Sequence, residues 1–275
     1  MTNDMLLNSN QLKSAAPWIV APLLFAAATG CGGMKEKNQP TVDKSASGTH
    51  SLLVFSKTTG FRHESIEAGV EALQKLGREL NLSLTFTENS EYMGSDSLFN
   101  HDGILFLNTT GTLFNEQERS NLKRFIQSGR GFVGVHSAAD TEYDWPWYEG
   151  LVGAYFDNHP NNPNVRQAAI MVSNENHPAL QGLPERWERD DEWYNYRSFK
   201  EGLNILLKLD TDSYEGSDHP GNHPIAWYRE YDGGRSFYTG LGHTEESFSD
   251  SLFLNHLTGG ILYALGIDDS MDKNQ

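Results

Sequence analysis

Apolar residues in this chain form short continuous runs, and stretches with helical periodicity lie between them. A continuous apolar run of about four to eight residues is typical of a strand that is covered on both faces of a sheet. Such strands are predicted at residues 51–55, 82–87, 103–108 and 131–135. Residues 64–80 place apolar side chains every three or four positions, which predicts a helix with one face against the sheet. A second helix is predicted to begin at Asn115, which pairs with Glu118 as in a capping box, and to end at Gly129.

The alternation of these strands and helices predicts an α/β fold with a doubly wound, mostly parallel sheet flanked by helices. Further strands are predicted at residues 168–172, 205–209, 224–229 and 235–241. Asp232, Gly233 and Gly234 form the turn of a predicted added β-hairpin, and residues 249–265 form a final helix. In such a fold, functional groups lie beyond the carboxyl ends of the strands.

The first part of the chain has the features of a secretion signal. Residues 15–30 (AAPWIVAPLLFAAATG) are apolar over the length of a signal peptide, but the run is too short and too interrupted by proline for a membrane span. Small residues lead into Cys31, and this segment resembles the lipobox at which bacterial lipoproteins are lipidated. The alternative is an inert thiol after an ordinary signal peptide.

This pattern divides the chain into four segments. We expect a lipoprotein signal peptide at residues 1–30, a flexible tether at 31–49, a folded α/β domain at 50–268 and a tail at 269–275. Lipidated Cys31 would anchor the protein in the cell envelope, facing the periplasm, with the outer membrane as the expected location. Cys31 is the single cysteine, so disulfides within the chain are excluded.

The net charge of −16 bears on the partners of the protein. Affinity for nucleic acid comes largely from Lys and Arg that neutralise phosphates, and no basic run is present. The same charge disfavours an anionic membrane surface, so membrane contact is expected through the lipid anchor only. Aromatic residues with many carboxylates suit a small-molecule carbohydrate, although aromatic residues more often fill a core.

Four polar clusters fall at the predicted ends of strands. They are residues 57–66 (KTTGFRHESI), 108–112 (NTTGT), 136–140 (HSAAD) and 242–246 (GHTEE). Loops from separate strands that meet at one edge of one sheet form the active site that this architecture requires. We therefore expect the four clusters to share one cavity.

Three histidines in these clusters are the candidate catalytic residues. His136 stands at a strand-to-helix corner and can act as a general base, a metal ligand or an electrophile, or can be a core histidine satisfied by the backbone. His63 and His243 lie where helices are predicted to begin, so each can instead be a helix-capping residue. Three histidines, or two with a carboxylate, can hold zinc or another divalent ion. No short motif such as HExxH is present to support a metal.

The segment DDEWYNY (190–196) is the best source of a carboxylate. If it forms one strand, Glu192, Tyr194 and Tyr196 share a face. Glu192 is then a candidate acid, base or ligand, and an acidic edge strand in solvent is the alternative. Asp140 is predicted to orient His136, to bind a substrate hydroxyl, or to cap a helix that begins at Tyr143. The remaining histidines beside proline are interpreted as turn residues: His159, His177, His219 and His223.

Four segments in this order, LVFSKTTGFRHESI, GFVGVHSAAD, DDEWYNY and FYTGLGHTEESF, resemble the trehalose-utilisation, ThuA-like family. The resemblance covers residues 51–266 and implies a fold similar to class I glutamine amidotransferases, which is flavodoxin-like. His136 occupies the position of the amidotransferase cysteine, so glutamine amidotransferase chemistry is excluded by residue type. The loop NTTGT corresponds to the oxyanion loop of that superfamily, so the Gly111 N–H is expected to polarise a bound carbonyl.

Family membership implies carbohydrate utilisation, in some systems beside dehydrogenases that oxidise disaccharides to keto-sugars. We therefore expect acid-base or metal-assisted chemistry on a sugar or a keto-glycoside. A divalent metal is the one possible cofactor, and only metal-assisted chemistry would require it. The catalytic candidates are His136, His63, Glu192 and His243, and the substrate-binding candidates are Gly111, Asp140, Tyr194 and Glu245. Two alternatives stay open: a non-catalytic sugar-binding lipoprotein, and an envelope interaction protein without a small ligand.

Overall fold

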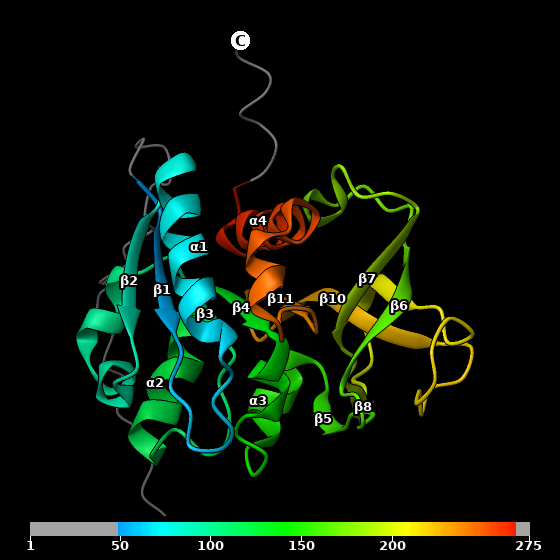
Figure 1. Ribbon diagram of the computed structural model, residues 1–275. Helices are drawn as coiled ribbons and strands as arrows, with labels where there is room; N and C mark the ends of the chain where they lie inside the picture. The colour runs from blue at the N-terminus through cyan, green and yellow to red at the C-terminus, as the bar shows by residue number, and fades with distance from the viewer. Residues whose placement is uncertain (1–48, 268–275) are drawn as a thin grey trace, which may run out of the picture. The chain divides into compact units, whose positions relative to one another are not determined.

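A nine-stranded β-sheet runs through residues 49–267, the part of the chain that the computed structural model describes (Figure 1). Its strand order is β2-β1-β3-β4-β11-β10-β9-β6-β7. The first five of these strands pair in parallel. They are β2 (Ser83–Thr87), β1 (Ser51–Phe55), β3 (Gly103–Leu107), β4 (Gly131–Val135) and β11 (Gly234–Thr239). With β11 as the fifth strand, this is the order of the flavodoxin-like doubly wound fold, so the predicted fold class is confirmed.

The other four strands extend the sheet by antiparallel pairing. They are β10 (His223–Tyr231), β9 (Asn204–Leu209), β6 (Val165–Val172) and β7 (Arg186–Glu192). The predicted hairpin joins β10 to β11 through Asp232 and Gly233, both with positive φ. The antiparallel part is therefore larger than one hairpin. Because pairing alternates along it, β9 and β7 run in the same direction as the parallel strands, and only β10 and β6 are reversed.

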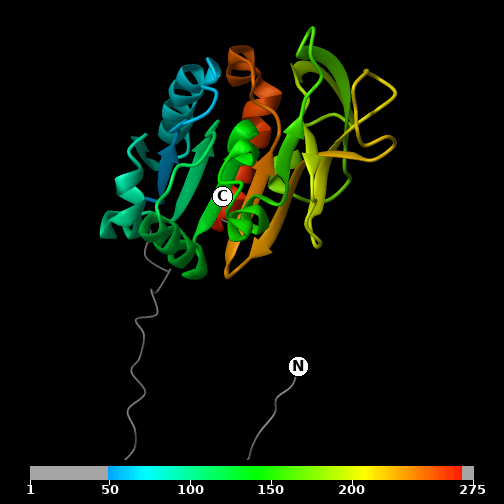
Figure 2. The same ribbon diagram turned by 90° about the horizontal axis from the view of Figure 1, so that it is seen from below.

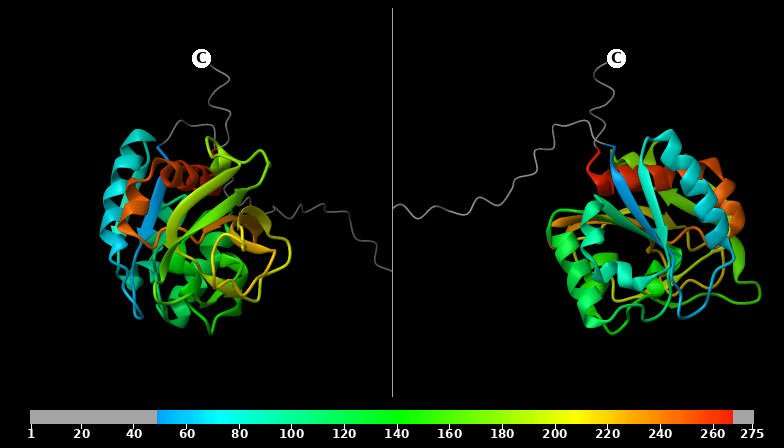
Figure 3. Two further views of the ribbon diagram at one scale, coloured as in Figure 1. Left: turned by 45° about the vertical axis from the view of Figure 1, so that its right-hand side comes forward. Right: turned by 90° about the vertical axis from the view of Figure 1, so that its left-hand side faces the viewer.

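Helices cover both faces of the sheet. On one face lie α1 (Ser65–Glu79) and α4 (Ser251–Leu265), and on the other lie α2 (Glu116–Gln127) and α3 (Pro146–Val152) (Figures 2 and 3). The short 3-10 helices are η1 (Ser90–Gly94), η2 (Asp96–Asn100), η3 (His136–Asp140), η4 (Pro178–Leu180) and η5 (Glu245–Ser249). Every residue of β3 and β4 is buried, as two-sided coverage requires.

Local sequence signals account for the ends of these elements. Asn115 and Glu118 form the predicted capping box at the start of α2. At the start of β4, a Cβ on Gly131 would lie 2.1 Å from the carbonyl oxygen of Ala264, so glycine is needed for α4 to approach the sheet. The helix predicted to begin at Tyr143 begins instead at Pro146, because proline fits the first turn of a helix.

The segment DDEWYNY does not form one strand, so the condition under which Glu192, Tyr194 and Tyr196 would share a strand face is not met. Strand β7 ends at Glu192, and residues Asn195–Arg197 form β8, which pairs with β5 (Tyr155–Asn158) in a separate two-stranded sheet. The buried Trp193 indole N–H donates to the carbonyl of Arg166 at the point where the chain leaves the large sheet. Packing of Trp193 therefore interrupts the strand, and the side chains on either side of it do not alternate as they would in one continuous strand.

Several predicted segments lie outside the described residues. They are the signal peptide at 1–30, Cys31, nearly all of the tether at 31–49, and the tail at 269–275. Among residues 49–267, none of the helices combines the length and the apolar character that a membrane span requires.

Candidate active site at the carboxyl edge of the sheet

His136 follows β4 directly and begins η3 with a φ of +48°, a left-handed conformation that is uncommon for a residue other than glycine. The side chain is fully buried. Its Nδ1 lies 2.9 Å from the carbonyl oxygen of Gly240, just beyond the end of β11. A carbonyl only accepts, so Nδ1 carries the hydrogen and Nε2 of the neutral ring has a free lone pair. The backbone therefore satisfies one ring nitrogen, and the other faces the neighbouring site residues.

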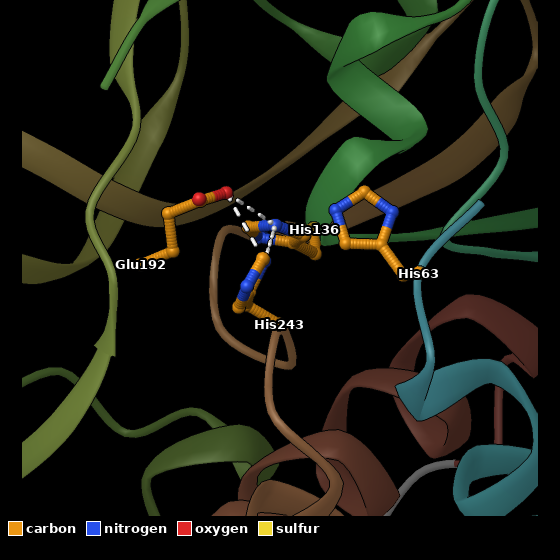
Figure 4. A group of neighbouring side chains, drawn as sticks. All are labelled: His63, His136, Glu192 and His243. Atoms are coloured by element: carbon orange, nitrogen blue, oxygen red, sulfur yellow. Dashed lines mark hydrogen bonds and ion pairs between the residues drawn. The ribbon is translucent and has the colours of Figure 1, made fainter. Parts of the chain in front are cut away.

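His243 lies in the loop between β11 and η5, and its ring faces His136 and Glu192 (Figure 4). Its Nδ1 is 3.2 Å from His136 Nε2 and 3.1 Å from Glu192 Oε2. The backbone N–H groups of Gly242 and His243 donate to the two carboxylate oxygens of Asp191, at 3.0 and 3.1 Å. The end of β7 thus holds the loop that carries His243.

Glu192 is the last residue of β7, and its two carboxylate oxygens face different groups. Oε2 lies 3.4 Å from His136 Nε2 and 3.1 Å from His243 Nδ1. Oε1 accepts a hydrogen bond of 2.8 Å from the Asn164 amide and lies 3.5 Å from His159 Nε2. Burial by itself raises the pKa of this carboxyl, but the hydrogen bonds and charges of His136 and His243 outweigh burial and hold the pKa well below its usual range. Glu192 is therefore an anion in the folded protein.

His63 lies between β1 and α1, with its ring edge-on to those of His136 and His243 at centroid distances of 4.9 and 5.1 Å. It is 3% exposed, and burial together with the two other imidazoles lowers its pKa to about 2. The ring is therefore neutral. Neither His63 nor His243 caps a helix, because α1 has no side-chain cap and Thr244 caps η5.

The structure brings His63, His136, Glu192 and His243 into one group, with one ligand atom from each within 4.8 Å of all the others. These residues follow β1, β4 and β11 or end β7, four strands that run in the same direction. Their carboxyl ends share one edge of the sheet, which is why residues far apart in the sequence meet there.

A cavity of about 370 Å³ opens beside this group, a size within the usual range for small-molecule sites. Its lining includes His63, Glu192 and His243, the aromatic rings of Phe61, Phe156 and Tyr194, and the polar side chains of Asp140, His159 and Asn164. His136 does not line it and lies behind the other residues. His136 is therefore not placed to act as a base in direct contact with a substrate in this cavity.

A second cavity, of about 420 Å³, shares Phe61, His63 and His243 with the first. Glu245 lines it and is exposed. The two cavities meet at His63 and His243, so the fourth polar cluster borders the same site as the first.

Two predicted binding residues differ from expectation. The N–H of Gly111 donates to the carbonyl of Asp140 at 2.8 Å, so it is not free to polarise a substrate carbonyl, and that prediction was wrong. A Cβ on Gly111 would lie 2.3 Å from Thr59 Oγ1, and its φ is +82°, so glycine is needed there for packing.

Asp140 neither orients His136, which Gly240 holds, nor caps a helix. Its carboxylate accepts a 2.6 Å hydrogen bond from the Tyr143 hydroxyl. Burial raises the pKa of the Asp140 carboxyl, which faces the cavity.

Tyr194 contributes its ring to the site. It packs on His136 at a centroid distance of 4.1 Å and on Phe156 at 4.2 Å. The ring thus forms a wall between His136 and the cavity, which is a different arrangement from the strand face that was expected.

Sequence reasoning missed three residues of the site. His159 was interpreted as a turn residue beside proline, and neither Asn164 nor Asp191 was assigned a role in the site. The sequence DNHPNNPN (157–164) between two strands carries a usable signal, because its density of side-chain amides and histidine exceeds what a simple turn needs. His177 accepts a local hydrogen bond from the Ala179 N–H, as a turn residue does. His219 and His223 bond residues 23 and 29 positions away, Tyr196 and Tyr194, and His223 is the buried first residue of β10, so the interpretation as a turn residue was wrong for His223.

Comparisons with known proteins agree with this architecture. The family model for ThuA, described as trehalose utilisation, matches residues 51–264. A solved structure of a ThuA-like protein from Bacteroides uniformis ATCC 8492 has a TM-score of 0.68 at 23% identity, covering 85% of this chain and 98% of that one. One from Parabacteroides merdae ATCC 43184 has a TM-score of 0.66 at 17% identity, covering 81% and 92%. No curated protein matched.

Proposed function

This chain belongs to the ThuA, or trehalose utilisation, family, and from that premise we propose that it acts on a sugar or an oxidised glycoside by acid-base chemistry. Family membership implies a carbohydrate-related role. The observation that carries the finer proposal is the meeting of three histidines and one anionic carboxylate beside a cavity of about 370 Å³.

The walls of the cavity suit a sugar. Phe61, Phe156 and Tyr194 present aromatic surface on which the C–H groups of a sugar ring can pack. Asp140 and Asn164 present polar groups that can bind hydroxyls. The combination of apolar walls with a few placed polar groups is typical of small-molecule sites.

His243 is the residue that we assign to proton transfer, because it lines the cavity and contacts Glu192. In a keto-sugar, the carbon beside the carbonyl loses its proton to the imidazole, and the C–H electron pair moves toward the carbonyl oxygen to give an enediolate. Glu192 then stabilises the imidazolium that forms. His136 positions His243 and Glu192 from behind, and neutral His63 faces the same space.

A non-catalytic sugar-binding protein is the second candidate, and the aromatic lining of the cavity favours it. A binder needs these walls but no proton transfer. The two candidates therefore differ in how they respond to loss of His243 and to loss of an aromatic wall.

The test is turnover and binding of trehalose and a panel of keto-disaccharides by the purified protein. For an enzyme, His243→Gln lowers kcat by about 100-fold or more, as removal of a general acid or base does, while the substrate Kd changes little. Phe156→Ala weakens binding in both cases. His101→Gln is the matched control, because this buried ring bonds Ser51 and Tyr92 at the opposite edge of the sheet. Binding without turnover would leave the sugar-binding protein, and absence of both would reject a carbohydrate site.

We also propose that the protein is a lipoprotein of the cell envelope, anchored through Cys31 and facing the periplasm. The support is the apolar segment 15–30 with small residues before the cysteine.

A further inference from the structure

We propose that His136, His243 and Glu192 bind one divalent transition-metal ion of the zinc class, with an open coordination position that faces the cavity. This inference does not rest on the identity of the substrate, and His243 cannot act as the proton acceptor while the ion is bound, because a ligand imidazole has no free lone pair. It rests on the positions of three atoms, on the hydrogens available to them and on the contacts behind them.

The three atoms form a nearly equilateral triangle (Figure 4). His136 Nε2 lies 3.2 Å from His243 Nδ1 and 3.4 Å from Glu192 Oε2, and His243 Nδ1 lies 3.1 Å from that oxygen. Ligand atoms 2.0–2.1 Å from a tetrahedral zinc ion are about 3.3 Å apart. The triangle therefore matches three corners of a tetrahedral site before any adjustment.

The three atoms have too few hydrogens to satisfy one another, so they lack a positively charged partner. When the His136 ring is neutral, the Gly240 carbonyl fixes its hydrogen on Nδ1, and Nε2 is then an acceptor. Glu192 Oε2 is an acceptor as well. His243 Nδ1 can offer at most one hydrogen to the two of them. Both acceptors are buried, and an unpaired buried acceptor is costly, so a cation at the centre satisfies all three atoms at once.

Contacts behind the triangle resemble those that orient metal ligands. A ligand histidine commonly donates its other ring N–H to a backbone carbonyl, and ligand carboxylates are themselves hydrogen-bonded. His136 donates to Gly240, and Asn164 holds the Oε1 atom of Glu192 at 2.8 Å. Oε2 is thereby left to point at the two imidazoles.

The donor set selects the class of metal. Two imidazole nitrogens and one carboxylate suit Zn²⁺ and its transition-metal neighbours, whereas Ca²⁺ and Mg²⁺ prefer shells made of oxygen. The ligand atom of His63 belongs to the wider 4.8 Å group and not to the triangle. We therefore place His63 beside the open position, on the side where it lines both cavities.

The experiment is metal titration of the purified protein after it has been stripped with a chelator. We expect one Zn²⁺ per chain by elemental analysis and, with Co²⁺ as a probe, a visible absorption band typical of a site with four or five ligands. Asn tolerates the left-handed conformation of His136, so His136→Asn, His243→Gln and Glu192→Gln are the test variants. Each should weaken Zn²⁺ binding by more than the roughly 10–100-fold that loss of an outer-shell partner causes.

His101→Gln is again the matched control and should bind one ion with unchanged affinity. His63→Gln should also keep the stoichiometry but alter the Co²⁺ spectrum. Thermal unfolding of the chelated variants verifies that each is folded. Absence of stoichiometric binding near pH 8, binding that survives in all three triangle variants, or a preference for Mg²⁺ or Ca²⁺ would overturn the proposal.

Discussion

At the scale of single residues, Glu142 is the carboxylate that fixes the loop after β3. Its side chain is fully buried, and its Oε1 accepts hydrogen bonds from the backbone N–H groups of Leu113 and Phe114. Its Oε2 accepts from Arg119 at 2.8 and 2.6 Å. Glu142 itself has a φ of +56°, and its N–H donates to the carbonyl of Gly111. One side chain thus replaces the backbone pairing that this irregular loop lacks.

Glu142→Ala should therefore lower the free energy of unfolding by about 3 kcal/mol, because it leaves two buried N–H groups and a largely buried guanidinium without their partner. Urea denaturation measures this loss. The matched control is Glu116→Ala, which removes the other carboxylate of Arg119; Glu116 is 92% exposed, so little change is expected. Equal effects of the two variants would contradict this account.

At the scale of elements, Asp191 joins the end of β7 to the loop after β11. It is fully buried and accepts from the N–H groups of Gly242 and His243. It also pairs with Arg189 at 3.1 Å. No backbone ladder connects β7 to β11, because three strands separate them in the sheet. A side chain must therefore set the position of His243 relative to Glu192.

Asp191→Asn should release this loop, since one carboxylate oxygen becomes a donor and then faces a backbone N–H. Hydrogen exchange of the Gly242 and His243 amides should accelerate by about tenfold or more, because an amide that loses its partner loses protection. Asp190→Asn, at the exposed neighbouring position, is the control and should leave the exchange unchanged. Unchanged protection in Asp191→Asn would refute the proposed connection.

At the scale of the whole described region, the sheet must curve for the site to exist. Glu192 ends the outermost strand, yet its carboxylate lies within 3.4 Å of a histidine that follows β4. The register between β9 and β10 shifts near Pro224, Ala226 and Trp227. Such irregularities increase local twist, and Figure 3 shows β6 and β7 running across the direction of the other strands.

The N-terminal segment carries a prediction of its own for the intact chain. If Cys31 is lipidated, labelled palmitate should be incorporated into the wild-type protein in bacteria and lost in Cys31→Ser. Ser45→Ala, in the same predicted tether, is the control and should keep the label. Soluble secretion of the unlabelled wild-type protein would reject the anchor.

Much of the site follows from rules that act locally. Strands β1, β3 and β4 are continuous apolar runs, so their ends, and the residues after them, can be read from the sequence. The edge rule for parallel strands then groups His63, His136 and His243. Glu192 came from a segment that was considered as one strand but forms two, and it lies in the site because β7 ends there, not because of strand alternation.

What the sequence could not provide concerns side-chain direction and partners. The roles of His159 and Asn164 depend on a long loop whose path no periodicity describes. The occupied N–H of Gly111 depends on a carbonyl 29 positions later, at Asp140. Likewise, only the tertiary structure places Tyr194 between His136 and the cavity.

By itself, the sequence determined the doubly wound α/β fold, the polar clusters at strand ends and the position of His136 directly after a buried strand, because these follow from apolar periodicity and residue type. Only the tertiary structure decided that β7 curves back to bring Glu192 to the histidines, and that three atoms meet in a triangle of 3.1 to 3.4 Å. The physical reason is that local patterns fix which face of an element is apolar, whereas distances between loops depend on the summed twist of the whole sheet.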